Sequence, residues 1–536
     1  MKVEVKQIEG YAYGAIQPSV VLTFSDYSAG AKDFNKKLRK LLEYLPRFED
    51  PRRFFDGDAS IDQASTPVAF VTLLDTLNHY CGDQRFTPIR VVEEGASLCF
   101  ALPTLSTAMT RFNMNAPKPL LDMMGQGTSR AKVQSFLEQH KGKARPLLPA
   151  GTNASNFIAA AAERKIPFKI FNQKYIIFGY GSGSCIFNSS ITDEESAIGV
   201  RLAKSKVDTN RLLKMSGIPV AEQAHVRTVD DAIRFAGRVG YPVVLKPEAE
   251  EQGRGVFANI VDETELRECW SALSRSDYGA LLIEQHIFGH IYRINTIDGK
   301  VVRVLKRIPA QVVGDGVSTI SELLSEFNED PRRADPNSAL VKLDFDQDVL
   351  RTLSKQSLNT NSIPQTGKIV YLTSIPNMSR GGTIDDFYDE FNSDNFALCE
   401  KISRIMRLHM TGIDVIAVDA SQTWCNGDFV ICEVNAQPQL FASRIQIHDN
   451  LIAQKIKVKP HVKLAISPLA VNETSLFDPN CSSIEIMISP ETVLRQGCPV
   501  QYYDQFEIAD DVSDVDRQKI ERMLVSVQPE LDHIAT

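Results

Sequence analysis

Apolar residues run along two segments that predict β-strands with polar side chains near their ends. Residues 429–435 form one such segment. Because successive side chains of a strand point to opposite faces, Glu433 and Asn435 share one face, roughly 6–7 Å apart. The other segment, residues 242–246, ends in Lys246 and precedes a glycine-bearing loop at 252–256. The two strands therefore predict oxygen donors on one strand, and a lysine beside a flexible loop on the other.

Apolar residues at helical spacing predict several helices. The clearest is residues 34–42, where Phe34, Leu38, Leu41 and Leu42 form one apolar stripe. Further helices are expected at 153–165, 208–215 (ending at Gly217), 229–239 and 395–408. Further strands are expected at 19–24, 89–92, 96–101, 168–171, 175–178, 224–227, 281–284 and 300–306.

The length of the chain and the breaks in these patterns predict several domains. The 536 residues suit three or four domains of about 150 residues each. Proline and glycine near residues 146–151 mark a linker, and residues 314–368 are polar and interrupted by glycine and proline, as suits a lid. The expected division is an N-terminal α/β accessory domain at 1–150, a connecting segment at 151–200, a nucleotide-binding core at 201–460 with a lid insertion at about 225–380, and a small appended domain at 461–536.

Composition and charge narrow the class of protein. With 43% hydrophobic and 24% charged residues the chain is typical of globular proteins. Its net charge of −8 argues against nucleic acid as a partner, because phosphate binding needs a basic surface. Nine scattered cysteines without a Cys-x-x-Cys pair predict reduced thiols. Since the first residues lack the apolar core of a signal peptide and no run of about 18 apolar residues occurs, we expect a cytoplasmic protein without a membrane partner.

The strand face of Glu433 and Asn435 suits a magnesium ion. A carboxylate and an amide oxygen, completed by a carboxylate from the neighbouring strand, form a hard oxygen site for Mg²⁺ and phosphates. Asp414 and Asp419 both precede this strand, and the strand register decides between them. A tight turn at Asn426-Gly427 would leave Asp414 too far from Glu433 to share an ion. We predict a wider connection, centred near residues 423–424, that pairs Asp414 with Glu433.

A series of short motifs follows in order along the middle of the chain. Its members are Gly179-Tyr180-Gly181-Ser182, Thr192-Asp193, residues 196–200, Lys206 with 210–213, residues 217–220, 307–310, 313–316, 330–333, Lys342, 362–364, 379–383, and 433–436 with Pro438. Each motif alone is weak, but the series resembles the ATP-grasp half of the cyanophycin synthetase family. The resemblance covers about residues 153–450 well and the first 150 loosely. It implies an α+β fold: an ATP-grasp core of two α+β subdomains with a lid insertion, preceded by an α/β accessory domain.

The resemblance also implies a role for each matched position. The triphosphate of ATP would be neutralised by Lys206 and Lys246. The glycine loop over the phosphates would contribute Gly253, Arg254 and Gly255. Adenine would be met by Glu284, Gln285 and Ile287. One or two Mg²⁺ ions would be held by Asp414, Glu433 and Asn435. The acyl-phosphate and the tetrahedral intermediate would be stabilised by Arg307, Ser379, Gly381 and Gly382.

Several positions depart from the family pattern. Ala249-Glu250-Glu251 replaces an Asp-Gly-Asn before the glycine loop, Ile291 stands where an acidic residue contacts ribose, and Gln439 replaces a glycine. The Gly-x-x-x-x-Gly-Lys-Ser/Thr motif that opens the family's second, Mur-ligase-like half does not occur. We therefore expect an altered acceptor rather than a lost site, and no two-residue repeating polymer.

Together these features predict an ADP-forming carboxylate–amine ligase that acts through an acyl-phosphate on an amino acid or short peptide. Two alternatives stay open: a small-molecule kinase on the same fold, and a catalytically silent ATP-binding subunit of a ligase assembly. The expected cofactors are ATP and one or two Mg²⁺ ions. The expected partners are small-molecule substrates and further copies of the chain, in a dimer or tetramer.

Charged residues near the expected site suggest the acceptor. Guanidinium groups match carboxylates, so a set of four arginines predicts an acidic amino acid or peptide. Glu250 and Glu251 would instead select a basic amine, and the two roles are compatible in one site. The expected product is a dipeptide or a one-residue extension, with stoichiometric ADP and phosphate. The four arginines are Arg254, Arg293, Arg307 and Arg380.

Overall fold

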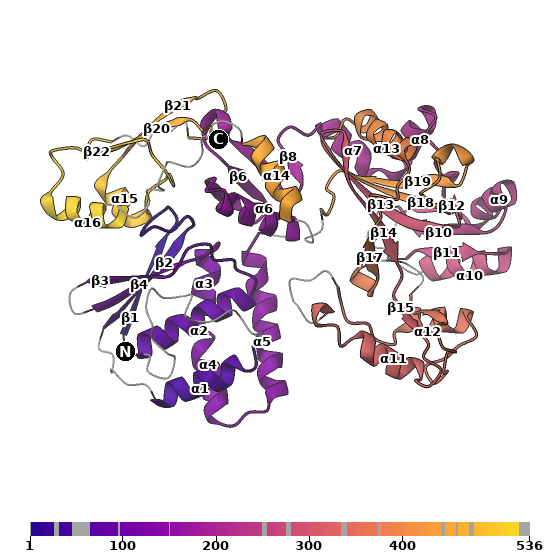
Figure 1. The fold of residues 1–536 in the computed structure, drawn as a ribbon, viewed down its shortest axis with the longest axis horizontal. Helices are drawn as coiled ribbons and strands as arrows, with labels where there is room; N and C mark the ends of the chain where they lie inside the picture. The colour runs from indigo at the N-terminus through magenta and orange to yellow at the C-terminus, as the bar shows by residue number, and fades with distance from the viewer. Residues whose placement is uncertain are drawn as a thin grey trace. The chain divides into compact units, whose positions relative to one another are not determined.

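The computed structural model describes most of the chain, which Figure 1 colours from the indigo N-terminus to the yellow C-terminus. Contacts between residues divide it into two compact units, Met1–Asp193 with Phe441–Thr536, and Glu194–Leu440. The four segments expected from the sequence stay a prediction. Among the described residues no helix is both long and apolar enough to cross a membrane. These residues are 2–25, 32–45, 65–94, 97–149, 151–248, 255–274, 280–333, 340–373, 376, 378–440, 445–456, 459–470 and 476–524.

The first unit begins with an antiparallel sheet in the order β1-β2-β4-β3. Apolar side chains of β2 and β4 pack against α2 in one core. The stripe expected at residues 34–42 lies in α1, where Leu38 and Leu41 are buried. The elements are β1 (Lys2–Ile8), β2 (Ser19–Ser25), α1 (Lys32–Leu42), α2 (Thr66–Tyr80), β3 (Arg90–Glu94), β4 (Ser97–Pro103), α3 (Thr107–Asn113), α4 (Pro117–Gly125) and α5 (Arg130–Ala144).

The same unit joins two further sheets from distant parts of the chain. One is antiparallel in the order β5-β6-β7-β8, and the other is parallel in the order β21-β20-β22. Tyr11 and Tyr180 belong to the core of the C-terminal sheet, and a backbone bridge pairs Tyr11 with Cys498. The elements are α6 (Thr152–Glu163), β5 (Phe168–Asn172), β6 (Tyr175–Phe178), β7 (Cys185–Asn188), β8 (Ile191–Thr192), α14 (Ile445–Lys455), β20 (His461–Ile466), β21 (Ser483–Ile488), α15 (Pro490–Gln496), β22 (Gln505–Ile508) and α16 (Asp514–Leu524).

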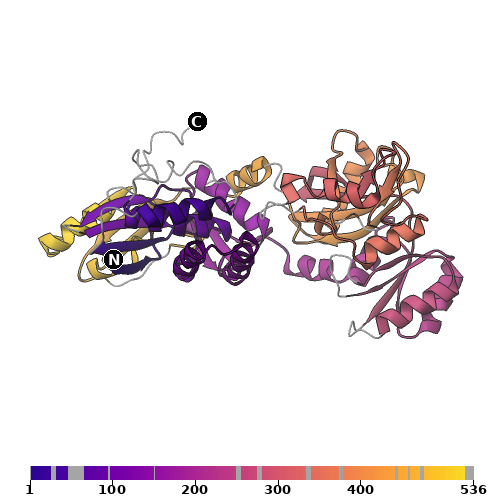
Figure 2. The ribbon, with the colours of Figure 1, turned by 90° about the horizontal axis from the view of Figure 1, so that it is seen from below.

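The second unit contains a small sheet in the order β11-β10-β12-β9, visible from two sides in Figures 1 and 2. Apolar residues of α9 and α10 pack on one face of this sheet, against Val243, Leu245 and Ile283. The alternation of a strand therefore directs Lys246 and Glu284 to the face without these helices. The elements are β9 (Gln223–Val226), α9 (Val229–Val239), β10 (Val243–Pro247), β11 (Phe257–Ile260), α10 (Glu263–Ser274) and β12 (Leu281–Gln285).

A five-stranded antiparallel sheet in the order β17-β14-β13-β18-β19 forms the centre of the second unit. Its apolar face, with Tyr292, Ile294 and Ile413, packs against α13 in one cluster of buried residues. The opposite face is polar and carries the predicted metal ligands. The elements are α7 (Ala197–Lys204), α8 (Lys206–Met215), β13 (His290–Ile297), β14 (Lys300–Ile308), β17 (Thr383–Asp386), α13 (Ser393–Met406), β18 (Met410–Ala417) and β19 (Phe429–Asn435).

The polar stretch expected to be a lid is a small subdomain with its own core. Its core residues include Val312, Ile320, Leu353 and Val370. A capping box at Thr319 begins its first helix. The elements are β15 (Gln311–Val313), α11 (Ile320–Phe327), α12 (Gln347–Lys355) and β16 (Ile369–Tyr371).

Most elements expected from the sequence are confirmed with small shifts of their ends. The expected helix at 229–239 and the expected strand at 429–435 have those bounds as α9 and β19. The helix expected at 395–408 is α13, which begins and ends two residues earlier.

Candidate active site

The hairpin of β18 and β19 pairs the two predicted carboxylates. Asp414 lies directly opposite Glu433, and Gly412 lies opposite Asn435. Beyond Asp414 the register shifts by one residue, so Cys432 forms a β-bulge. The predicted pairing of Asp414 with Glu433 is confirmed. The alternative, a tight turn at Asn426-Gly427 with regular pairing, is wrong because pairing begins only at Ala417 and Phe429.

Two arginines from the adjacent strands contact Asp414. Nε of Arg293 on β13 lies 2.8 Å from Oδ1 of Asp414, and Nη2 of Arg307 on β14 lies 3.5 Å from the same atom. Burial lowers the pKa of Arg307, and the neighbouring charge of Asp414 opposes that shift. Oδ1 of Asp414 is buried without an aligned hydrogen bond, so its charge is balanced by the ion pairs with Arg293 and Arg307. This carboxylate is therefore held by charge on the polar face of the sheet.

Gly412 makes room for one of these arginines. A Cβ added at Gly412 would overlap with Nη1 of Arg293 and lie 3.0 Å from Cβ of Pro438. Arg293 and Asp414 are paired neighbours across β13 and β18, and Gly412 is two residues from Asp414 on the same face. The absence of a side chain at Gly412 therefore permits the contact between Arg293 and Asp414.

Lys206 connects the hairpin to the small sheet. It is the first residue of α8, whose N-terminus is capped by the Ser205 side chain. Its Nζ lies 3.7 Å from Oε1 of Glu433 and donates a hydrogen bond of 3.2 Å to the carbonyl of Glu248, just after β10. The predicted phosphate lysine is thus beside the predicted metal carboxylate.

Lys246 and Glu284 form an ion pair on the small sheet. Nζ of Lys246 lies 2.7 Å from Oε1 of Glu284, and both side chains are mostly buried. The sequence placed Glu284 and the backbone of Gln285 and Ile287 at adenine. The amide of Gln285 already donates to the carbonyl of Glu222 at 2.9 Å, so this donor is used within the protein. Ile287 lies in the connection between β12 and β13.

The predicted glycine loop is described only at its last residues. Gly253, Arg254 and the segment 249–251 lie outside the described residues. Gly255 has φ +67°, a left-handed conformation, and a Cβ there would lie 3.0 Å from Cγ of Pro247. Both facts favour glycine at this position.

The segment with Ser379, Gly381 and Gly382 leads directly into the site sheet. The backbone of Ser379 lies in a short 3₁₀-helix, Met378–Arg380, and its side chain is not among those that the structure describes. Gly381 is buried and has φ +78°. Two residues after Gly382, Ile384 of β17 pairs with Arg307. The structure therefore brings this loop next to the strand of Arg307.

Arg380, expected to attract a substrate carboxylate, pairs with two aspartates of the lid. The sequence assigned its charge to a substrate carboxylate, together with Arg293 and Arg307. In the structure its guanidinium donates to Asp346 at 2.7 Å and to Asp348 at 3.0 Å. Both acceptors lie at the N-terminus of α12, so the charge of Arg380 is balanced within the lid.

Two polar residues of the site sheet were not anticipated. Arg303 is buried and donates to the carbonyl of Leu440 at 3.3 Å, while Asn295 donates to the carbonyl of Gln439 at 3.4 Å. They hold the segment that follows β19. The alternation of side chains along a strand could have predicted their positions. Arg303 is four residues from Arg307 on β14, and Asn295 is two residues from Arg293 on β13, so each lies on the same face as that arginine.

The oxygen donors of this face fit a hard divalent cation. Within the described residues no three acidic, His or Cys side chains lie close enough together to hold a metal ion alone. The donors on this face are the carboxylates of Asp414 and Glu433 and the side-chain amide of Asn435. Mg²⁺ normally keeps waters and binds through one or two carboxylates plus substrate phosphates. Because the buried Oδ1 of Asp414 lacks an aligned donor, this set is compatible with such an ion.

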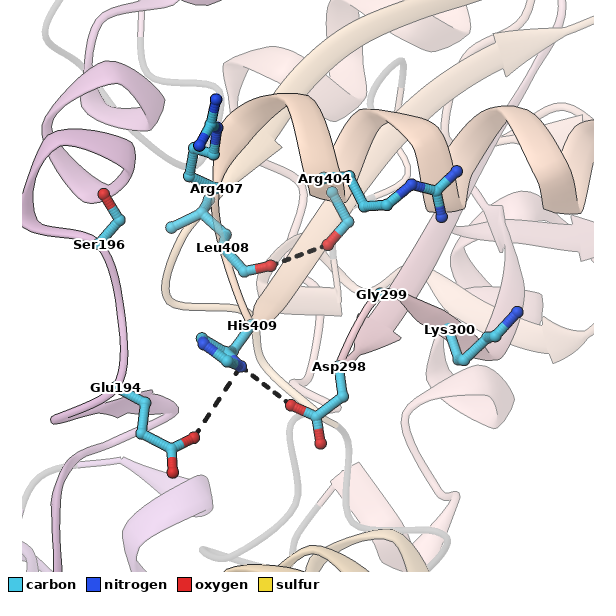
Figure 3. Close-up of a pocket in the computed structure, with 10 residues that line it drawn as sticks. Glu194, Ser196, Asp298, Gly299, Lys300, Arg404, Arg407, Leu408 and His409 are labelled. Atoms are coloured by element: carbon cyan, nitrogen blue, oxygen red, sulfur yellow. Dashed lines mark hydrogen bonds and ion pairs between the residues drawn. The ribbon is translucent and has the colours of Figure 1, made fainter.

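A pocket of about 710 Å³ lies at the other end of the same strands (Figure 3). There His409 faces Asp298 at 3.0 Å and Glu194 at 3.9 Å. The arginines Arg404 and Arg407 point in different directions in Figure 3, so they do not converge on one ligand. His409 is five residues from Asp414 along β18, roughly 17 Å at strand spacing. The pocket is therefore separate from the candidate active site.

Comparisons with known proteins point to one fold for the middle of the chain. Residues 205–335 match the family model described as carbamoyl-phosphate synthase L chain, ATP binding domain. Cyanophycin synthetase of Trichormus variabilis is 35% identical over 293 residues, covering 54% of this chain and 32% of that protein. The bifunctional glutathione biosynthesis protein GshAB of Mannheimia succiniciproducens is 26% identical over 304 residues, covering 55% of this chain and 40% of that protein.

A solved structure, a bifunctional glutathione synthetase from Pasteurella multocida, aligns with TM-score 0.45 and 16% identity over 82% of each chain. The chain spans 32% to 40% of the length of the two curated relatives described above. The family match and the sequence identity show an ATP-grasp fold in the central part, within an α+β chain, as the resemblance implied. The resemblance to cyanophycin synthetases is confirmed over that part and does not extend to the rest.

Proposed function

We propose that the chain is an ATP-dependent, ADP-forming carboxylate–amine ligase that forms an amide bond on an amino acid or short peptide. The observation that carries the proposal is the pairing of Asp414 with Glu433, with Arg293, Arg307 and Lys206 against the two carboxylates. Opposed carboxylates surrounded by cations suit the transfer of a phosphoryl group, whose transition state carries spread negative charge.

The proposed reaction has two steps. A carboxylate oxygen of the first substrate attacks the γ-phosphorus of ATP, the bond to the β-phosphate oxygen breaks, and ADP leaves. The amine nitrogen of the second substrate then attacks the acyl carbon, phosphate leaves with its electron pair, and the amine loses a proton. Bound Mg²⁺ would offset charge on the β- and γ-phosphates.

The protein's own residues would orient and stabilise these charges. Lys206 and Lys246 would contact the phosphates as point charges. Arg307, on the strand that pairs with β17, would stabilise the negative oxygens of the acyl-phosphate and the tetrahedral intermediate. Gly381 and Gly382 directly precede β17, which pairs with the strand of Arg307. Because the amide of Gly381 donates to the carbonyl of Met378 at 3.1 Å, the amide of Gly382 is the candidate for the same role.

The substrate class rests on the relatives. The relatives that match part of this chain are named for the synthesis of cyanophycin and of glutathione, two products built from amino acids. We extend this class to the chain, with ATP and one or two Mg²⁺ ions. The homo-oligomer and the cytoplasmic location expected from the sequence stay predictions.

Release of ADP and phosphate tests the proposal. Purified protein is incubated with ATP, Mg²⁺ and candidate carboxylates, first alone and then with amines, and products are identified by mass spectrometry. A ligase forms an amide with equimolar ADP and phosphate only when both substrates are present. A phosphorylated product without an amide would establish the kinase alternative, and no turnover with any pair would favour the silent subunit.

A matched pair of variants links the activity to this site. Asp414→Asn removes one of the paired carboxylates, whereas Asp419→Asn alters an exposed aspartate after β18. We expect Asp414→Asn to lower turnover at least about a hundredfold, as for other preorganised charge stabilisers. Equal turnover of the two variants would contradict the assignment.

A further inference from the structure

Arg333 in the lid is a buried arginine that the proposed reaction does not use. It ends the 3₁₀-helix Pro331–Arg333 after α11 and is only 7% exposed. A guanidinium removed from water is costly unless its donors are satisfied, so its partners show what holds it there. Its neighbour Arg332 is different, because it pairs with Asp330 on the surface.

The partners of Arg333 come from three separate segments of the chain, two in the lid and one between the lid and β17. Its Cζ lies 3.7 Å from the ring centroid of Phe327, at the end of α11. Nη1 donates to the carbonyl of Val341 at 2.7 Å, and Nη2 donates to the carbonyl of Gly381 at 3.2 Å. A planar guanidinium presents its donors at fixed angles, so one side chain sets the relative position of these segments.

Gly381 is the partner with consequences for the active site. Its left-handed backbone packs against Ala310 and Leu343, where a Cβ would lie 3.3 Å and 3.5 Å from their Cβ atoms. On the other side, Arg380 binds the N-terminus of α12. The segment is therefore fixed from two directions immediately before β17, which pairs with the strand of Arg307.

We propose that Arg333 is a positioning residue, which fixes the peptide between Gly381 and Gly382 so that the amide of Gly382 meets the reacting carboxyl group. This deepens the proposed ligase function and rests on it. Arg333 itself does not touch substrate in this proposal. It acts through the carbonyl of Gly381, which shares one peptide plane with the N–H of Gly382. The N–H of Gly381 itself donates to the carbonyl of Met378 at 3.1 Å.

The test compares Arg333→Met with Arg332→Met, a matched control that removes an exposed guanidinium. Arg333→Met leaves the carbonyls of Val341 and Gly381 without this donor, so the thermal midpoint should fall, and kcat is compared at a temperature where every variant is folded. We expect Arg333→Met to lower kcat about 10- to 100-fold, since small misplacements of reacting groups have effects of this size. The KM for ATP should stay within about twofold of the native value, because Lys206 and Lys246 are untouched.

Hydrogen exchange of residues 378–386 gives a readout that does not depend on turnover. Arg333→Met should increase exchange there, Arg332→Met should not, and Arg333→Lys, which keeps one flexible donor, should recover part of both protection and kcat. Unchanged exchange in Arg333→Met would overturn the proposal, and so would increased exchange with native kcat. If the native protein forms no amide with any substrate pair, the proposed function fails, and exchange alone decides whether Arg333 holds the segment.

Discussion

Replacing Gly412 by alanine tests the arrangement of charges at the candidate site without removing any charged group. The new Cβ would overlap with Nη1 of Arg293 and approach Pro438 to 3.0 Å. The guanidinium is the far end of a flexible side chain, so it can move, whereas the backbone of β18 is fixed by pairing on both sides. We therefore expect Arg293 to move away from Asp414.

The size of the effect follows from the ion-pair distance. At an effective dielectric constant of about 20, moving Nε of Arg293 from 2.8 Å to about 4 Å from Oδ1 of Asp414 weakens the attraction by about 2 kcal/mol. Each side chain of the pair is 12% exposed, so water screens it little. Alanine loses less backbone entropy on folding than glycine does, which stabilises the folded state by about 0.5–1 kcal/mol. The free energy of unfolding should therefore fall by about 1 kcal/mol. If the weakened ion pair costs the transition state the same amount, about 2 kcal/mol, the rate falls about thirtyfold.

The assay is turnover of ATP to ADP with substrates present, together with the free energy of unfolding in urea. Gly237→Ala is the control, because a Cβ at Gly237 of α9 meets nothing within 4 Å. Gly237→Ala should keep native turnover and gain a little stability through its helix propensity. If Gly412→Ala matches Gly237→Ala in both measurements, the contact between Arg293 and Asp414 does not support the site.

Two further predictions concern different parts of the molecule. Lys246→Ala and Glu433→Gln should each lower kcat at least about a hundredfold at a temperature where the variants are folded, and near-native rates for both would refute the site. In the first unit, burial raises the pKa of Asp83 to about 7. The native state then binds a proton that the unfolded chain releases near pH 4, so the free energy of unfolding should fall as pH rises from about 4 to about 7. Asp83→Asn should flatten that dependence in urea titrations, and an unchanged slope would contradict it.

Local sequence signals were sufficient for the elements but not for the pairing of Asp414 with Glu433. The helix α9 has a threonine cap and a regular apolar stripe, and its bounds were expected residue by residue. The local turn signal at Asn426-Gly427 favoured a different register, and the correct pairing was expected because the metal site requires it. The shift at Cys432 was not expected, because a bulge depends on how two strands twist against their neighbours.

Side-chain partners were harder to predict than backbone pairing. The sequence suggested that Glu284 meets adenine and that Arg380 meets substrate, yet each is paired with a protein charge. Such pairs join residues far apart along the chain, and each residue alone carries no sign of its partner. The buried position of Arg333 was hidden for the same reason, since an adjacent arginine in the same motif is exposed.

These ion pairs bear on which acceptor the site would bind. Four arginines were expected to attract an acidic substrate, and Arg254 lies outside the described residues. Arg293 and Arg307 both face Asp414, and Arg380 faces two aspartates. An arginine that already balances a protein carboxylate has less charge to offer a ligand, because the attraction between charges falls as each is neutralised nearby. An acidic acceptor would therefore have to compete with the protein's own carboxylates for these guanidiniums. Any preference between acidic and basic acceptors should consequently depend on groups other than these three arginines.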